Sequence, residues 1–333
     1  MNKMVLSLTQ SLFGASIPVL CYHQVRPDSG MTPEKFGRHL DLINKLGFQT
    51  ISLANLHRII QGQTPQTGPS VVITFDDCTL DNWLYAVPQL LRRNMHGVFF
   101  AITDFIPPGQ TRLRADQTMN PSTVPAFGDI MQQALSGHCD GFMNEAEIRA
   151  AVHDLGMEVY SHSAAHQACF TREEQTGTLG ENRHWSHAAL CGQDADAAVH
   201  PVGSAYAHAG FGLDWNGRPL TLKTDQERLA FCVTDFSAAK AKLEDLLDQP
   251  CPFLCLPWGE YDNITLDAVK TAGYQGALNL EAGVVGPGIA PMRIGRLAVK
   301  DRKTPSWLGL KTLLLAHRTM APWAQMRNPG RRS

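Results

Sequence analysis

Two adjacent acids, Asp76 and Asp77, follow the apolar run Val71–Phe75, which is rich in β-branched residues. Such a run, entered through Gly68 and Pro69, predicts a buried strand. A carboxylate at the end of a core strand is costly unless it is paired, hydrogen-bonded or bound to a metal. Because α/β folds build sites at the carboxyl ends of strands, we interpret these acids as site residues. The alternative is that they cap the helix expected to begin near residue 81.

A pair of histidines, His162 and His166, follows a second predicted strand, Met157–Tyr160. Residues four apart lie on one face of a helical turn, so both imidazoles can reach one ion. The spacing alone does not distinguish a metal site from two packed histidines. Together with an aspartate at another strand end, however, the pair completes a set of two histidines and one carboxylate that suits a divalent metal.

With these motifs the sequence resembles the NodB-like polysaccharide deacetylases, carbohydrate esterase family 4. The family's first motif, T-F-D-D-G, reads here Thr74–Cys78, with cysteine in place of the usual glycine, and the second, H-S/T-x-x-H, is complete as His162–His166. The resemblance extends to Pro18–His23 and to Leu256–Tyr261. It is closest to the branch that acts on exported poly-N-acetylglucosamine.

The resemblance implies a role for each matched position. Asp76 would be the catalytic base, and a divalent metal would be bound by Asp77, His162 and His166. Zinc is the default ion, and cobalt, nickel or iron would fit the same ligands. The residues implied to contact the substrate are Cys78 through its backbone, Pro257, Trp258, Gly259 and His23. His23 can equally be read as a packed core histidine.

Two functional positions of the family are not matched. The arginine that holds the base in the third motif is missing, because Phe253–Cys255 occupy that region. We hypothesise that Arg296, in the last predicted strand, replaces it. The C-terminal L-x-H that supplies the general acid is also missing, and we expect another histidine to serve; the candidates are His184, His187, His200, His208 and His23.

The alternation of predicted strands and helices indicates an α/β fold with a parallel sheet or barrel. By resemblance it is a distorted, incomplete (β/α) barrel with long loop insertions. We expect an N-terminal extension at 1–16, the barrel at 17–300 with insertions at about 103–143 and 167–234, and a basic C-terminal tail at 301–333. After the second insertion we expect a helix at Ser237–Leu247. The aromatic residues of that insertion either line a substrate cleft or form a satellite core.

Composition narrows the functional classes. The 333 residues are 44% hydrophobic, enough for one large core, and the net charge of −2 gives no case for nucleic-acid binding. The eight cysteines form no C-x-x-C pair, which favours a reducing compartment. With a poor signal peptide, this predicts a cytoplasmic protein or one at the membrane face, with the periplasm as the alternative. The apolar stretch Trp307–Leu315 of the basic tail either packs on the barrel or makes peripheral contact with an anionic membrane.

These observations predict a metal-dependent hydrolase that removes N-acetyl groups from amino sugars of an envelope polysaccharide, a glycolipid or its precursor. Its partner is an N-acetylated saccharide or glycolipid. Two alternatives stay open at this point. One is a hydrolase of a small non-sugar amide on the same scaffold, and the other is a glycan-binding relative with weakened catalysis.

Overall fold

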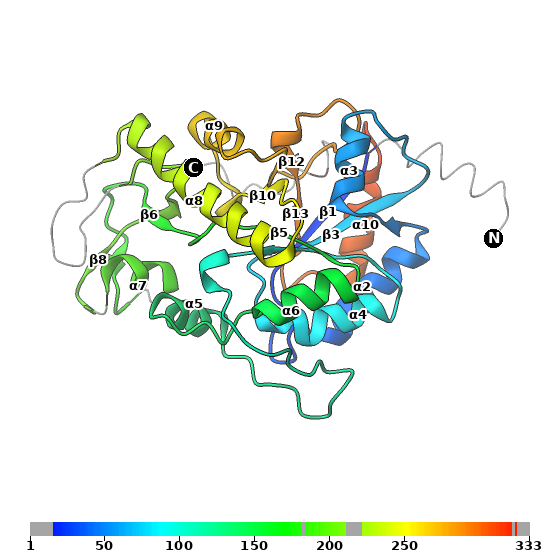
Figure 1. Cartoon of the computed structure of the whole chain (residues 1–333), viewed down its shortest axis with the longest axis horizontal. Helices are drawn as coiled ribbons and strands as arrows, with labels where there is room; N and C mark the ends of the chain where they lie inside the picture. Colours follow the sequence, from blue (N-terminus) through cyan, green and yellow to red (C-terminus); the bar gives the residue numbers. More distant parts are fainter. Residues whose placement is uncertain (1–15, 182–183, 193, 211–221, 322–323, 325–333) are drawn as a thin grey trace.

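The centre of the protein is a parallel sheet rolled into a barrel, as the computed structural model in Figure 1 shows. The structure describes residues 16–181, 184–192, 194–210, 222–321 and 324. Buried, apolar strands form the wall, as expected when helices cover a parallel sheet. In spatial order the strands are β12 (Ile294–Gly295), β11 (Gly276–Asn279), β10 (Phe253–Cys255), β5 (Glu158–Ser161), β4 (Val98–Ala101), β3 (Ser70–Phe75), β1 (Val19–Tyr22) and β13 (Leu297–Ala298).

The two ends of this sheet, β12 and β13, are neighbours in the chain and are separated by Arg296 alone. β12 pairs in parallel with β11, and β13 pairs in parallel with β1. A single short segment from Ile294 to Ala298, the closing segment, therefore changes its strand partner at Arg296 and brings the two ends of the sheet together. The predicted distorted (β/α) barrel is confirmed, and it is nearly closed.

Helices surround the barrel, and most begin at a side-chain cap that the sequence encodes. Thr32 accepts a hydrogen bond from the Lys35 amide at the start of α2, and Ser52 accepts one from the Asn55 amide at the start of α3. The elements outside the barrel wall are α2 (Pro33–Lys45), β2 (Gln49–Thr50, paired with β3), α3 (Leu53–Ile60), η1 (Asn82–Ala86), α4 (Val87–Leu91), η2 (Thr103–Phe105), α5 (Phe127–Leu135), α6 (Glu145–Arg149), η3 (Ala150–Asp154), β6 (Ala168–Phe170), β7 (Gly177–Thr178), α7 (Trp185–Cys191), β8 (Ala198–Val199), β9 (Val202–Ser204), α8 (Asp225–Leu247), η4 (Pro257–Gly259), α9 (Asn263–Thr271), η5 (Pro291–Arg293) and α10 (Pro305–Ala316).

The helix expected at Ser237–Leu247 begins earlier, at Asp225, so the predicted insertion boundary at 234 falls inside α8. Thr224 accepts a hydrogen bond from the Glu227 amide, and the Glu227 carboxylate accepts one from the Thr224 amide. This reciprocal pair is a capping box. The T-x-x-E pattern was therefore the signal for the helix start, whereas the mixed polar and apolar sequence after it obscured the helical period.

The two long insertions meet. β6 pairs with β9 and β7 pairs with β8, both antiparallel, and α7 lies among them. In Figure 1 these green elements gather at the left beside α5, which belongs to the first insertion and packs against α7. The residues at 211–221 of the second insertion lie outside the described part of the chain.

The predicted helix of the basic tail is α10, and it packs against α2. Leu308 and Leu315 are buried, and Gly309 lies against Leu42. This is the packed arrangement of the two that the sequence left open. Among the described helices, none combines the length and apolar character needed to cross a bilayer. The N-terminal extension up to residue 15 and nearly all of the tail beyond 321 lie outside the described residues.

The closing segment leads to a stability prediction. A Cβ added at Gly295 would collide with the Glu281 carbonyl oxygen, whereas one added at Gly128 in α5 has no atom within 4 Å. We expect Gly295→Ala to lower the free energy of unfolding by about 1–3 kcal/mol, the usual range for overpacking against atoms that do not yield. Gly128→Ala is the control. Denaturant unfolding measures the stability of both variants. Equal unfolding midpoints would contradict the expectation that only glycine fits at position 295.

Candidate active site

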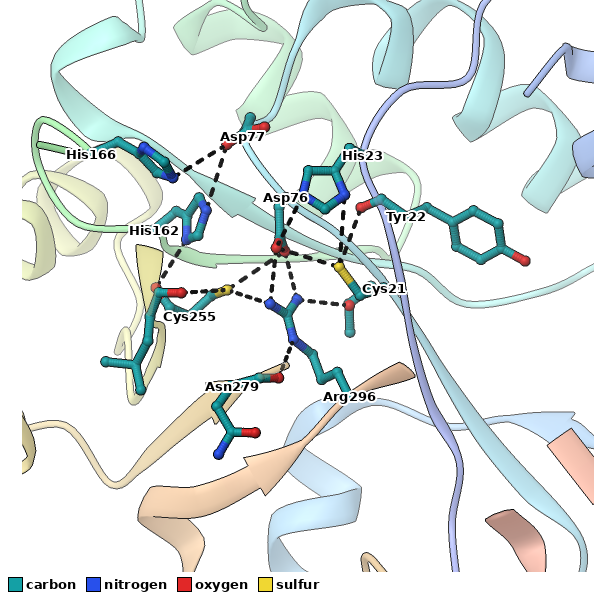
Figure 2. A network of polar contacts seen from close by, with 12 residues as sticks. Cys21, Tyr22, His23, Asp76, Asp77, His162, His166, Cys255, Asn279 and Arg296 are labelled. Atoms are coloured by element: carbon teal, nitrogen blue, oxygen red, sulfur yellow. Dashed lines mark hydrogen bonds and ion pairs between the residues drawn. The ribbon is translucent and has the colours of Figure 1, made fainter. Parts of the chain in front are cut away.

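The predicted site residues meet at one rim of the barrel, where the carboxyl ends of the parallel strands lie together (Figure 2). Asp76 follows β3 and His162 follows β5. Cys255 ends β10, and Arg296 lies at the point where the closing segment changes partner. The fold thus gathers residues that are more than 200 positions apart in the sequence.

Asp76 and Arg296 form a buried, bidentate ion pair. Nη1 of Arg296 lies 2.6 Å from Oδ1 of Asp76, and Nη2 lies 2.9 Å from Oδ2. The guanidinium also donates to Oγ1 of Thr74 and to the Asn279 carbonyl oxygen. This planar fork matches a carboxylate far better than a lysine ammonium would. Arg296 therefore occupies the position that the sequence hypothesis gave it, on Asp76.

The environment of Asp76 keeps it ionised. Burial raises its pKa, but the charge and hydrogen bonds of Arg296, together with the nearby His162 and His23, outweigh burial and lower the pKa well below its ordinary value. Two thiols flank the same carboxylate: Sγ of Cys21 lies 3.4 Å from Oδ2, and Sγ of Cys255 lies 3.6 Å from Oδ1. Cys255, from the region where the family's third motif would have its arginine, and Arg296 thus both contact Asp76.

Asp77, His162 and His166 converge beside this pair. Nε2 of His162 lies 3.5 Å and Nε2 of His166 lies 4.0 Å from Oδ1 of Asp77. Nδ1 of His162 donates to the Cys255 carbonyl oxygen at 2.9 Å, which leaves Nε2 with a free lone pair facing Asp77. The three donor atoms are too far apart for strong hydrogen bonds and close enough to share one ion.

The donor set also fits a divalent metal on electrostatic grounds. Burial raises the pKa of Asp77 and lowers that of His166, so each group lacks compensation for its buried charge or polarity. Nδ1 of His166 is buried and has no hydrogen-bond partner among the described residues. One carboxylate oxygen and two imidazole nitrogens, one of them fixed by a second hydrogen bond, match zinc and related ions.

The backbone is strained where these residues lie. Asp77, Cys78, Ser163, His166 and Trp258 all have positive φ angles, between 48° and 73°. For residues other than glycine this region costs about 1–3 kcal/mol each and persists where the surroundings enforce it. Strain of this kind clusters at sites where side-chain direction matters more than stability.

A buried network holds the segment His162–His166, the histidine loop, in this conformation. Asp235 of α8 accepts hydrogen bonds from the Ala164 and Ala165 amides at 2.8 Å and 3.3 Å. Tyr206, from the second insertion, donates to Asp235 at 2.8 Å. Sequence reasoning missed Asp235, because it lies in the part of α8 that was not predicted, and it counted Tyr206 only among the aromatic residues of the second insertion. The capping box at Thr224 would have placed Asp235 on a helix.

The acid and histidine groups open onto a cavity of about 670 Å³. Trp258 and Trp185 stack on each other along its wall, with ring centres 5.7 Å apart. Of the sequence-predicted substrate contacts, His23, Trp258 and Gly259 line the cavity, whereas Cys78 and Pro257 are buried beside it. Trp185 was foreseen only as one of several insertion aromatics, and it both lines the cavity and packs into the hydrophobic core.

The histidines considered as the general acid differ in their distance from the cavity. The side chain of His23 is 47% exposed, and its Nε2 lies 3.9 Å from Oδ2 of Asp76. His184 lines the cavity, but its Nδ1 is held by Ser186 at the start of α7, and burial lowers its pKa. His187, His200 and His208 are not among the residues that line the cavity.

Comparison with known proteins gives a family-model match, one related sequence and several related structures. The family model of the polysaccharide deacetylases matches residues 63–212, which include Asp76, Asp77, His162 and His166. YxkH of Bacillus subtilis (strain 168), a curated protein whose assignment as a polysaccharide deacetylase is provisional, is 29% identical over 90 residues. That alignment covers 26% of this chain and 32% of YxkH.

Three solved structures share the fold over nearly the whole chain. A de-N-acetylase from Aggregatibacter actinomycetemcomitans is 16% identical, with 90% of this chain and 99% of that one covered and a TM-score of 0.64. IcaB from Ammonifex degensii is 18% identical, with 89% and 98% covered and a TM-score of 0.59. The BpsB deacetylase domain from Bordetella bronchiseptica is 20% identical, with 86% and 97% covered and a TM-score of 0.59. Residues 63–212, with their two motifs, are therefore similar to the polysaccharide deacetylases, and the barrel has the fold of these solved structures.

Proposed function

We propose that the protein is a metal-dependent hydrolase that removes N-acetyl groups from amino sugars of an envelope polysaccharide, a glycolipid or its precursor. One observation carries the proposal. A carboxylate held ionised by Arg296 lies beside a set of one carboxylate and two imidazoles, at the floor of a cavity with a tryptophan wall. The family supports the reaction class, and the poly-N-acetylglucosamine branch is the nearest resemblance in sequence.

The metal ligands in this proposal are Asp77, His162 and His166. A divalent ion held there would lower the pKa of a bound water and polarise the acyl oxygen of the substrate. Zinc is the default, and cobalt, nickel or iron suit the same donors. The hydrogen bond from Nδ1 of His162 to the Cys255 carbonyl oxygen fixes the tautomer that presents Nε2 to the ion.

Asp76 acts as the general base in this scheme. It takes the proton of the attacking water, and Arg296 keeps the carboxylate aimed and ionised before the reaction begins. Its neighbour Asp77 has no guanidinium partner among the described residues, and its Oδ1 faces the two imidazoles instead. The two adjacent acids therefore take different roles because they face different partners.

His23 is our choice for the general acid that protonates the departing amine. Partial burial opposes its protonation, but the Cys21 sulfur and the two carboxylates offset this effect and raise the pKa of His23. It therefore carries a proton at neutral pH and lines the same cavity as Asp76. The lowered pKa of His184 makes that residue the weaker candidate.

The stacked tryptophans provide the sugar-binding surface. Aromatic faces pack well against the apolar faces of sugar rings. Nε1 of Trp258 is buried and has no hydrogen-bond partner among the described residues, so it is available to a substrate hydroxyl. A panel of N-acetylated saccharides and simple acetamides, assayed for acetate release, tests the proposal. Turnover of the acetamides alone would replace the sugar substrate by a small amide, and binding of saccharides without any turnover would indicate a glycan-binding protein.

Substitutions of Asp76 and Asp77 should have different effects on metal binding and on turnover. We expect Asp77→Asn to abolish high-affinity metal binding and acetate release together. Asp76→Asn keeps an acceptor for Arg296, so the variant should still bind one metal while its turnover number falls by about 10²–10⁴, the range for loss of a general base. Metal content and acetate release measure the two effects. Loss of metal from both variants alike would refute the separate roles.

The proton donor leads to a prediction about pH. Because a general acid must be protonated, the turnover number should fall as pH rises through the pKa of His23, which lies above the ordinary histidine value. We expect His23→Gln to lower turnover by about 10²–10⁴ and to remove this alkaline limb. His184→Gln is the control and should retain it. A profile that keeps its alkaline limb in His23→Gln would rule His23 out.

The support of the histidine loop can be tested through metal affinity. Asp235→Asn leaves one acceptor for the Ala164 amide but puts a donor against the Ala165 amide and the Tyr206 hydroxyl. We expect metal affinity to fall about 10–100-fold, as for other residues that orient ligands. Asp245, an exposed acid on the same helix, is the control as Asp245→Asn. Unchanged affinity in Asp235→Asn would mean that the network serves folding alone.

A further inference from the structure

One wall of the cavity is cationic. Directly after β13 the chain makes a turn, and Lys300, Arg302 and Lys303 line the same cavity as Asp76 and Trp258. The sequence assigned most of this turn to a basic tail, without a place in the site. The structure instead brings it to the mouth of the catalytic cavity.

The backbone of this cationic turn (Lys300–Lys303) is fixed before any ligand arrives. The Val299 amide donates to the Cys21 carbonyl oxygen at 2.8 Å, and the Lys303 amide donates to the Lys300 carbonyl oxygen at 2.9 Å. Lys35 of α2 donates to the Asp301 carbonyl oxygen from the outside. A charged group on a fixed backbone costs less ordering on binding than one on a free tail.

The positive charge of the turn is not neutralised locally. Within the described residues neither Lys300 nor Arg302 forms an ion pair, and Lys303 lies over the Trp307 ring. The acid of the turn, Asp301, also lines the cavity, so the turn presents three cationic residues against one carboxylate and keeps a net positive charge. Deeper in the cavity, Asp76 is already paired with Arg296, and Asp77 belongs to the metal donor set.

We propose that the cationic turn binds an anionic group carried by the substrate next to its N-acetylated amino sugar. This proposal rests on the proposed function and specifies the substrate class as an anionic saccharide. A phosphate on a sugar precursor and the carboxylate of a neighbouring uronic acid share this chemistry. Arginine binds either group through paired hydrogen bonds, and lysine adds a point charge. The same charges attract an anionic substrate towards the cavity.

The test uses the full chain and three substrates: a neutral oligomer of N-acetylglucosamine, N-acetylglucosamine 1-phosphate, and an oligosaccharide that alternates N-acetylglucosamine with glucuronate. We expect the wild type to favour at least one anionic substrate over the neutral oligomer. Comparing the phosphate with the glucuronate substrate shows which anionic group the turn binds. Lys300→Glu/Arg302→Glu should lower kcat/KM for that substrate by about tenfold or more relative to kcat/KM for the neutral oligomer. The preference should also shrink as salt is added.

Matched controls exclude a general charge effect. Arg58→Glu/Lys242→Glu makes the same change in net charge at exposed positions that do not line the cavity, and it should leave the preference intact. Lys300→Gln/Arg302→Gln should give an intermediate loss. Equal kcat/KM for neutral and anionic substrates in the wild type would overturn the proposal, as would identical behaviour of the two Glu variants.

A binding measurement separates this proposal from the proposed function. Inorganic pyrophosphate should raise the melting temperature of the metal-loaded wild type and of the Arg58→Glu/Lys242→Glu control, but not of Lys300→Glu/Arg302→Glu. If no substrate releases acetate and this pattern still holds, the hydrolase proposal fails while the anion site stands. If acetate is released but pyrophosphate shifts all three proteins equally, the anion site fails alone.

Discussion

The ion pair between Asp76 and Arg296 is the constraint on which the rest of this structure depends. Removing one partner of such a buried pair typically costs about 3–5 kcal/mol, because the other charge is left uncompensated. The pair joins β3 to the segment that closes the barrel, so it has an architectural effect as well as an electrostatic one. The same contact that aligns the wall of the barrel keeps a carboxylate ionised at its rim.

Around this pair, the backbone adopts strained conformations that direct side chains towards the cavity at a cost in folding stability. Several side chains that face the cavity come from backbone in the left-handed region, which folding alone would avoid. The histidine loop tolerates this because Asp235 and Tyr206 satisfy its amides and hydroxyl from behind. The support comes from α8 and from the second insertion, so the insertion contributes to the rigidity of the site as well as to its wall.

Local sequence patterns were sufficient for the residues that lie at strand ends. Asp76, Asp77, His162 and His166 could be placed because an apolar strand fixes where its carboxyl end emerges, and Arg296 was proposed as a substitute for the missing third-motif arginine of the resembled family. Their catalytic and metal-binding roles stay predictions. Cys21, Asp235 and Lys300 could not be placed, since their importance lies in contacts across the barrel that leave no period or spacing in the sequence. The start of α8 was readable from its capping box and was missed because apolar periodicity was weighed first.

The arginine that balances Asp76 lies between the last two barrel strands, and this has a consequence for the order of events during synthesis. Asp76 leaves the ribosome about 220 residues before its partner. Until the closing segment is made, the carboxylate has no guanidinium, and the sheet ends at β1 on one side and at β11 on the other. A nascent chain can therefore assemble most of its barrel wall while the Asp76 carboxylate has no guanidinium partner. In the proposed scheme, the site would be completed late and in a single step, when the closing segment docks.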